Sequence, residues 1–87
     1  MATIRVVLYG HDGCPGTAGA REYLCARGIA FEERDIADPG ARAEMRRWHA
    51  WATPLLVLDG RFAMVGFDGQ HLEALIERAG GGEPDVS

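Results

Sequence analysis

The pattern of apolar and polar positions predicts four strands and three helices in the order βαβαββα. Residues 3–9 and 54–58 are rich in apolar side chains without strict alternation, which is typical of strands that are buried on both faces of a sheet. Residues 29–36 mix apolar and charged positions, as an outer strand does. Residues 61–65 are expected to return antiparallel to 54–58, since Asp59-Gly60 is a two-residue hairpin turn. The pattern therefore indicates an α/β fold around a mixed sheet.

Three segments show the spacing of amphipathic helices. The first is expected from Pro15 to Arg27, the second from Asp38-Pro39 to near His49, and the third from Asp68 to the glycines at 80–82. Asp38 and Asp68 are placed to cap the second and third helices. The apolar stripes consist of Ala20 and Leu24, of Ala41, Met45 and Trp48, and of Leu72, Leu75, Ile76 and Ala79. Residues 1–80 are thus expected to form one domain, and residues 81–87 a disordered tail.

Composition narrows the function classes. With 87 residues and 47% apolar positions, the sequence fits a single small domain. Its net charge of -4 argues against nucleic-acid binding, which needs a basic face. No apolar run approaches the ~20 residues that span a bilayer, and no secretory leader is evident. We expect a cytoplasmic monomer that binds neither nucleic acid nor membrane.

Cys14 is the residue on which a chemical function can be built. It lies between Gly13 and Pro15, directly before the first predicted helix, where free backbone N–H groups and the helix dipole favour a thiolate. Pro15 suits the first helical position. A free cysteine is often a small buried hydrophobe, but this polar turn favours a reactive thiolate. Thr17, one helical turn later, is placed to donate its hydroxyl to the sulfur, and the pKa of Cys14 is expected below its ordinary value.

The other chemistry-bearing residues admit plainer readings. His11 is either a proton-handling group or a solvated turn residue. Cys25 lies eleven residues along the same predicted helix, roughly 16 Å from Cys14, so the two cannot form a disulfide. Packing is its expected role, with secondary oxidation the alternative if it is exposed. His11 and Cys14, with Asp12 or His49, match no zinc-ligand spacing, so no metal site is expected.

The element order, the cysteine at the first strand-to-helix turn, and Thr53-Pro54 at the start of the third strand resemble the glutaredoxins and related small electron donors of the thioredoxin-like fold. The resemblance extends from Val6 to Asp68. It implies the sheet order 2-1-3-4, with the first and third helices on one face and the second on the other. It also implies a cis Thr53-Pro54 bond, which would turn the Thr53 backbone toward Cys14, so that an extended thiol peptide could pair there as an added strand.

The resemblance further implies a thiol-disulfide oxidoreductase. The second cysteine of the dithiol mechanism is replaced here by Thr17. Single-cysteine members use an external thiol such as glutathione, without a permanently bound cofactor, or share a 2Fe–2S cluster between two subunits. We therefore expect Cys14 to act as a monothiol nucleophile on a small thiol or a disulfide-containing protein. The alternatives are a cluster carrier that is a Cys14-bridged dimer, and a non-catalytic docking domain.

The resemblance also assigns the substrate-binding side chains. His11 stands where the family usually has lysine, and Trp51 where a polar or basic residue often helps to bind the glutathione carboxylate, so Trp51 is a candidate docking surface instead. Asp68 and the helix that it begins could bind a γ-glutamyl end. Gly66-Phe67 resembles donors that thioredoxin reductase reduces. The expected substrate-binding residues are Thr53, Pro54, Trp51, Gly66, Phe67 and Asp68.

Overall fold

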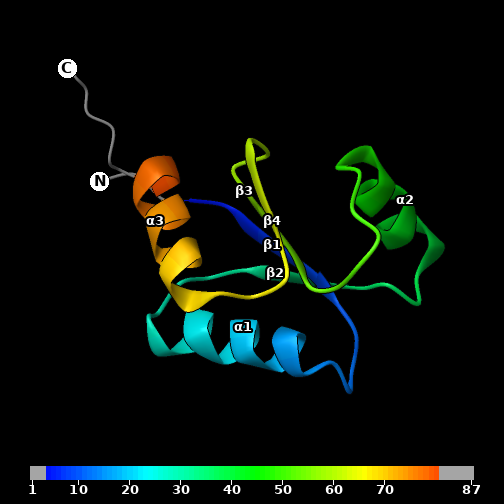
Figure 1. The fold of residues 1–87 in the computed structure, drawn as a ribbon, viewed down its shortest axis with the longest axis horizontal. Helices are drawn as coiled ribbons and strands as arrows, with labels where there is room; N and C mark the ends of the chain where they lie inside the picture. The colour runs from blue at the N-terminus through cyan, green and yellow to red at the C-terminus, as the bar shows by residue number, and fades with distance from the viewer. Residues whose placement is uncertain (1–3, 81–87) are drawn as a thin grey trace.

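The computed structural model describes residues 4–80, and its elements follow the predicted order (Figure 1). They are β1 (Val6–Gly10), α1 (Pro15–Ala26), β2 (Glu32–Asp35), α2 (Pro39–Arg47), β3 (Leu55–Leu58), β4 (Phe62–Val65) and α3 (Gly69–Gly80). The sheet order β2-β1-β3-β4 confirms the prediction. β1 pairs parallel with β2 and antiparallel with β3, and β3 pairs antiparallel with β4. The predicted tail at 81–87 lies outside the described residues.

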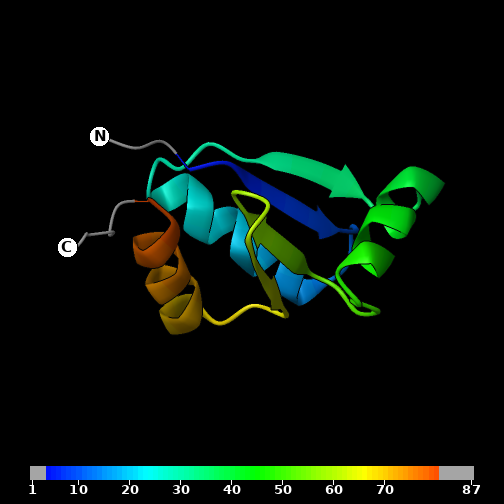
Figure 2. The ribbon, with the colours of Figure 1, turned by 90° about the horizontal axis from the view of Figure 1, so that it is seen from above.

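The sheet separates two apolar cores, and Figure 2 shows α2 at the opposite end of the molecule from α3. On one face, Ala20 and Leu24 of α1 and Leu72 and Leu75 of α3 pack against alternate residues of the strands, among them Val6, Leu8, Leu56, Leu58 and Met64. On the other face, Ala41 and Met45 of α2 pack with Tyr9, Leu55 and Val57. This confirms that α1 and α3 share one face and α2 covers the other. It also confirms the three predicted apolar stripes.

Two strands begin at least two residues later than their apolar patterns predict. β2 begins at Glu32 rather than at residue 29, because the Ile29 N–H still donates to the Leu24 carbonyl and completes the turn that ends α1. β1 begins at Val6, so that Ile4 and Arg5, which the predicted strand included, lie outside it. Arg5 instead bonds to the β3–β4 hairpin: its N–H donates to the Asp59 carboxylate, and its carbonyl accepts from the Asp59 N–H. An apolar sequence pattern can therefore continue past the end of the hydrogen-bonded strand.

The turns follow the local chemistry of their residues. Asp59 and Gly60 have φ values of 55° and 64°, which a tight hairpin turn with two left-handed residues requires. Asp38 caps α2 by accepting from the Gly40 N–H, as predicted. α2 ends at Arg47, two residues before the expected His49, because Ala50 N–H donates back to the Met45 carbonyl. The Thr53-Pro54 peptide bond is cis, as the resemblance implied.

A polar network fastens α2 to the sheet. The Tyr9 hydroxyl donates to Glu44 at 2.8 Å, and Arg34 donates to both carboxylate oxygens of Glu44 at 2.9 Å. Burial, then the hydrogen bond to Glu44, raises the pKa of Tyr9 to about 12. Because the loop that carries Thr53 runs directly from α2 to β3, this network fixes the start of that loop beside the sheet.

Candidate functional site

Cys14 lies at the junction of β1 and α1. It is the residue immediately before the helix, with φ -91° and ψ 114°, and Pro15 occupies the first helical turn. Its carbonyl accepts from the Ala18 N–H at 3.1 Å, and its own N–H donates to the His11 carbonyl at 3.3 Å. The residue is half-buried and its thiol is free. The local fold thus presents one sulfur, partly open to solvent, at a helix N-terminus.

The loop before β3 meets this sulfur from the opposite side. The Thr53 hydroxyl donates to the Cys14 Sγ at 3.5 Å, a contact that the sequence did not indicate. Pro54 is buried next to the first turn of α1. A methyl group on Gly16 would lie 2.8 Å from Pro54 Cδ and 4.0 Å from the sulfur. Only a glycine at position 16 lets the proline approach the helix this closely.

Thr17 lies close enough to the Cys14 sulfur for its hydroxyl to influence the thiol pKa. Its side chain is fully buried, and a methyl group on Gly10 would lie 2.4 Å from its Oγ1. Among the described residues, this hydroxyl has no partner in a well-aligned hydrogen bond. A buried hydroxyl without a partner is costly, so a negative charge on the nearby sulfur would compensate for that cost. Gly10 and Gly16 are site residues that the sequence did not indicate, because the atoms they approach, in Thr17 and Pro54, become their neighbours only in the folded chain.

These groups lower the pKa of the Cys14 thiol from 9.0 to about 7. The Thr17 hydroxyl lowers the pKa most, followed by the Thr53 hydroxyl and the Thr17 backbone N–H. Partial burial raises the pKa, and the Gly16 N–H lowers it slightly. The sulfur makes no formed capping hydrogen bond to the helix, so the backbone groups act as nearby dipoles. About half of the thiol is therefore ionised near neutral pH.

Three of the remaining predicted residues differ in their relation to the proline: Gly66 bonds to it, whereas the contacts of Phe67 and His11 lie elsewhere. The Gly66 N–H donates to the Pro54 carbonyl at 2.7 Å, which joins the segment before α3 to the site. Phe67 is half-buried and packs edge-on against Tyr23. The His11 ring is exposed and bonds to the Asp12 carbonyl at 2.8 Å, and among the hydrogen bonds of residues 4–80 none joins that ring to the sulfur.

Asp68 and Trp51, the last two predicted binding residues, are both exposed. The Asp68 carboxylate caps α3 by accepting from the N–H groups of Gln70 and His71 at 3.0 and 3.3 Å. The predicted cap is thus in place, and the residue is exposed. Trp51 is 78% exposed in the loop between α2 and β3. An indole this exposed is available for contact with a partner.

Cys25 does not pack. It is exposed on α1, and its thiol is free. The expectation of a packing role was wrong because Leu24, its neighbour, occupies the buried side of the helix, and one residue turns the helix by about 100°. In the part of the chain that the structure describes, no group of three or more His, Cys, Asp or Glu side chains could hold a metal ion. None of the helices within residues 4–80 has the length and apolar character needed to span a bilayer.

The glutaredoxin family model matches residues 6–63 of the chain. This range contains β1, α1, the Thr53-Pro54 step and nearly all of the β3–β4 hairpin. No curated protein sequence gives a significant match.

Solved structures support the same fold. A glutaredoxin from Brucella melitensis is 30% identical, with 88% of this chain and 86% of that chain covered and a TM-score of 0.64. A glutaredoxin from Archaeoglobus fulgidus is 25% identical, with 87% of each chain covered and a TM-score of 0.69. A thioredoxin-like protein is 29% identical, with coverage of 80% and 97% and a TM-score of 0.74. These matches confirm the thioredoxin-like fold that the sequence predicted.

Proposed function

Because this chain belongs to the glutaredoxin family, we propose that it is a thiol-disulfide oxidoreductase that works through Cys14 alone. The observation that carries the proposal is the Cys14 sulfur, half-buried at the start of α1, facing Thr53 and Pro54 and holding a thiol pKa of about 7. A thiolate of this pKa is abundant at neutral pH and remains a good nucleophile, which is the compromise that thiol-disulfide exchange favours.

The reaction proceeds in two exchanges. The Cys14 thiolate attacks the small-thiol sulfur of a mixed disulfide, a new S–S bond forms, and the substrate thiolate leaves with the electron pair of the broken bond and takes a proton from water. A second small thiolate then attacks the sulfur now bound to Cys14. A small disulfide is released and the Cys14 thiolate is regenerated. In net terms, one mixed disulfide and one free small thiol become the substrate thiol and a small disulfide, so the substrate sulfur is reduced and the sulfur of the free small thiol is oxidised.

The chain's own groups hold the sulfur in its charged form. The Thr17 and Thr53 hydroxyls and the N–H groups at the start of α1 stabilise negative charge on Cys14 before attack and when it departs. Since Thr17 cannot supply a second thiol, the release step needs an external one. Glutathione or another low-molecular-weight thiol fits this role, with its γ-glutamyl end near Asp68 and the N-terminus of α3.

The reductant and compartment complete the proposal. Gly66-Phe67, next to Pro54, leaves thioredoxin reductase as the second possible electron source. We expect the protein to act as a cytoplasmic monomer on a small thiol or on a disulfide-containing protein. A 2Fe–2S cluster would need thiolates beyond the one that this chain offers at the site, so a second subunit and two external thiols would have to complete its four ligands.

Turnover of a small mixed disulfide with glutathione in excess tests the proposal. The unaltered protein and Cys25→Ser should turn it over at the same rate, because Cys25 is exposed and remote from the site. Cys14→Ser should have no activity. Activity that survives in Cys14→Ser would refute the proposal. A protein that is inert in all three forms would indicate a docking domain, and a coloured dimer after anaerobic reconstitution would indicate a cluster carrier.

A further inference from the structure

A groove opens beside the sulfur on the α2 side of the site. Its cavity has a volume of about 110 Å³. Thr53 forms part of its wall, and the hydroxyl of the same residue donates to Cys14 Sγ at 3.5 Å. The groove is therefore one residue away from the reacting atom. A substrate chain that reaches the sulfur must pass this groove or turn away from it.

The groove has an apolar floor and one aromatic wall. Met45 and Ala50, both nearly fully buried, and the half-buried Ile36 line it from α2 and the adjoining loops. The Trp51 side chain stands beside it and is 78% exposed. An exposed indole next to an apolar hollow is the composition of a contact site for a partner's large apolar side chain.

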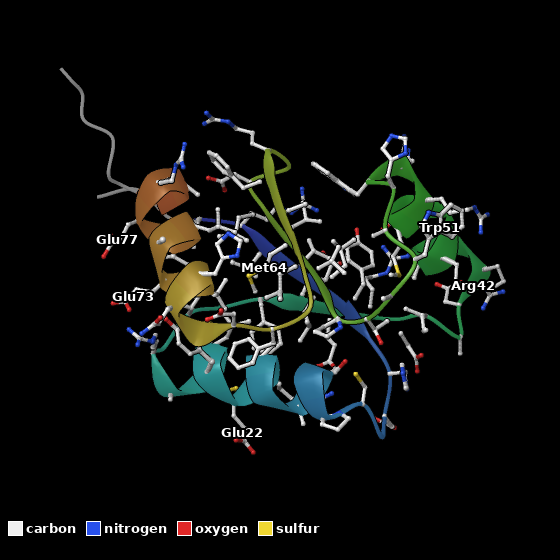
Figure 3. All side chains as sticks on the ribbon, in the orientation of Figure 1. Glu22, Arg42, Trp51, Met64, Glu73 and Glu77 are labelled. Carbon is white, nitrogen blue, oxygen red and sulfur yellow. The ribbon has the colours of Figure 1, made fainter. Side chains whose placement is uncertain are left out.

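Two arginines form the polar rim. Arg42 and Arg46 are four residues apart on α2, so they project from the same side of the helix. Figure 3 shows Arg42 and Trp51 at the same end of the molecule, on and beside α2. Arg42 Nη1 donates to the carbonyls of Ile36 and Ala37 at 2.7 and 3.3 Å, which fixes the guanidinium without neutralising its charge.

The rim charge is not cancelled locally. Among the residues that line the groove there is no carboxylate. Within the described part of the chain, the ion pairs of other arginines do not extend to Arg42 or Arg46. The whole chain carries a net charge of -4, so this positive rim contrasts with the rest of the surface. Its charge complements an acidic partner.

We infer that this groove selects the substrate: a protein or peptide disulfide that carries an acidic residue and a large apolar residue within a few positions of its reactive cysteine. The spacing follows from an extended chain, which advances about 3.3 Å per residue, so two or three residues reach from the sulfur past Thr53 to Trp51. A small thiol occupies only the end of the groove at the sulfur. This inference rests on the proposed function and adds its specificity.

Three peptides joined to the same small thiol through a mixed disulfide test the inference. One carries glutamate and leucine next to the cysteine, the second carries lysine and leucine, and the third carries glutamate and alanine. The acidic apolar peptide should show the highest kcat/KM, about tenfold above the lysine peptide at low salt, mainly through a lower KM. The difference should shrink as salt is added, because the rim is exposed.

Arg46→Glu should reverse the ranking of the glutamate and lysine peptides. Arg47→Glu is the matched control, because it makes the same charge change one residue along α2 but faces a different cavity, the one bordered by Tyr9 and Glu44. It should leave the ranking as it is. Equal kcat/KM values for all three peptides, or a reversal by both variants, would overturn the inference.

Two further measurements separate this inference from the proposed function. If the unaltered protein reduces a small uncharged disulfide but does not rank the peptides, the groove does not select and the oxidoreductase proposal stands. If no disulfide is turned over, binding of the reduced peptides to the Cys14→Ser protein still tests the inference. Tighter binding of the acidic apolar peptide, lost in Arg46→Glu, would support selection by the groove. Equal binding of the three peptides would refute it.

Discussion

Replacing Thr17 by valine should change the stability of the fold and the reactivity of the Cys14 sulfur in opposite directions. Valine keeps the shape of threonine and removes the hydroxyl. That hydroxyl is the largest of the influences that lower the Cys14 pKa, and it is buried without a well-aligned partner among the described residues. The same oxygen is thus unfavourable for folding and favourable for the thiolate.

The two effects have opposite signs and measurable sizes. Removing a buried hydroxyl that lacks a partner should leave the free energy of unfolding unchanged or raise it by about 1 kcal/mol. The Cys14 pKa should rise from about 7 toward its ordinary value of 9.0. A rise of roughly one unit would reduce the thiolate fraction at pH 7 from about half to about a tenth. The reaction with a disulfide should slow by a similar factor at that pH and recover near pH 9.

Both quantities are measured in a Cys25→Ser background, so that only one thiol titrates. The pH dependence of alkylation gives the pKa of Cys14, and chemical denaturation gives the free energy of unfolding. Thr53→Val is the matched control, because it removes the other hydroxyl that bonds to the sulfur. In this variant the pKa of Cys14 should rise less than in Thr17→Val. An unchanged Cys14 pKa in Thr17→Val, or a large loss of stability, would refute this reasoning.

Three other predictions follow from the contacts. The reduced protein should become more stable as the pH rises from about 7 to 9, because the folded Cys14 loses its proton before the unfolded one does; denaturation at several pH values should show this rise, and Cys14→Ser should lack it. Gly10→Ala places a methyl group 2.4 Å from Thr17 Oγ1 and should lower the free energy of unfolding by about 1–3 kcal/mol, measured by denaturation. Tyr9→Phe removes the hydrogen bond to Glu44 and should cost about 1 kcal/mol, and the tyrosine titration near pH 12 should disappear with it.

The fold could be predicted because each element is specified by residues close to one another in the chain. Pro39 after Asp38 begins a helix, Asp59-Gly60 makes a tight turn, and the apolar stripes choose the faces. Strand ends were less certain, since Ile29 and Phe31 are apolar but pack against the core from outside the ladder. An apolar position indicates burial, and burial does not require a strand.

The site was predicted only as far as a motif can show it. The position of Cys14 and the presence of Thr17 one turn later could be read from spacing alone. The contact of the Thr53 hydroxyl with the sulfur, and the close approach of Pro54 to Gly16, join residues about forty positions apart and need the folded chain. Cys25 was misjudged because a residue at the edge of an apolar stripe faces either the core or solvent, and only packing decides.

The reaction of Cys25→Ser protein with a small disulfide, followed by intact mass as a function of pH, tests most directly whether Cys14 is an accessible and activated nucleophile. One adduct per chain should form, located on Cys14, at a rate that rises with a midpoint at about pH 7. The absence of an adduct, or a midpoint at the ordinary thiol pKa of 9.0, would contradict the claim that Cys14 is an accessible and activated nucleophile.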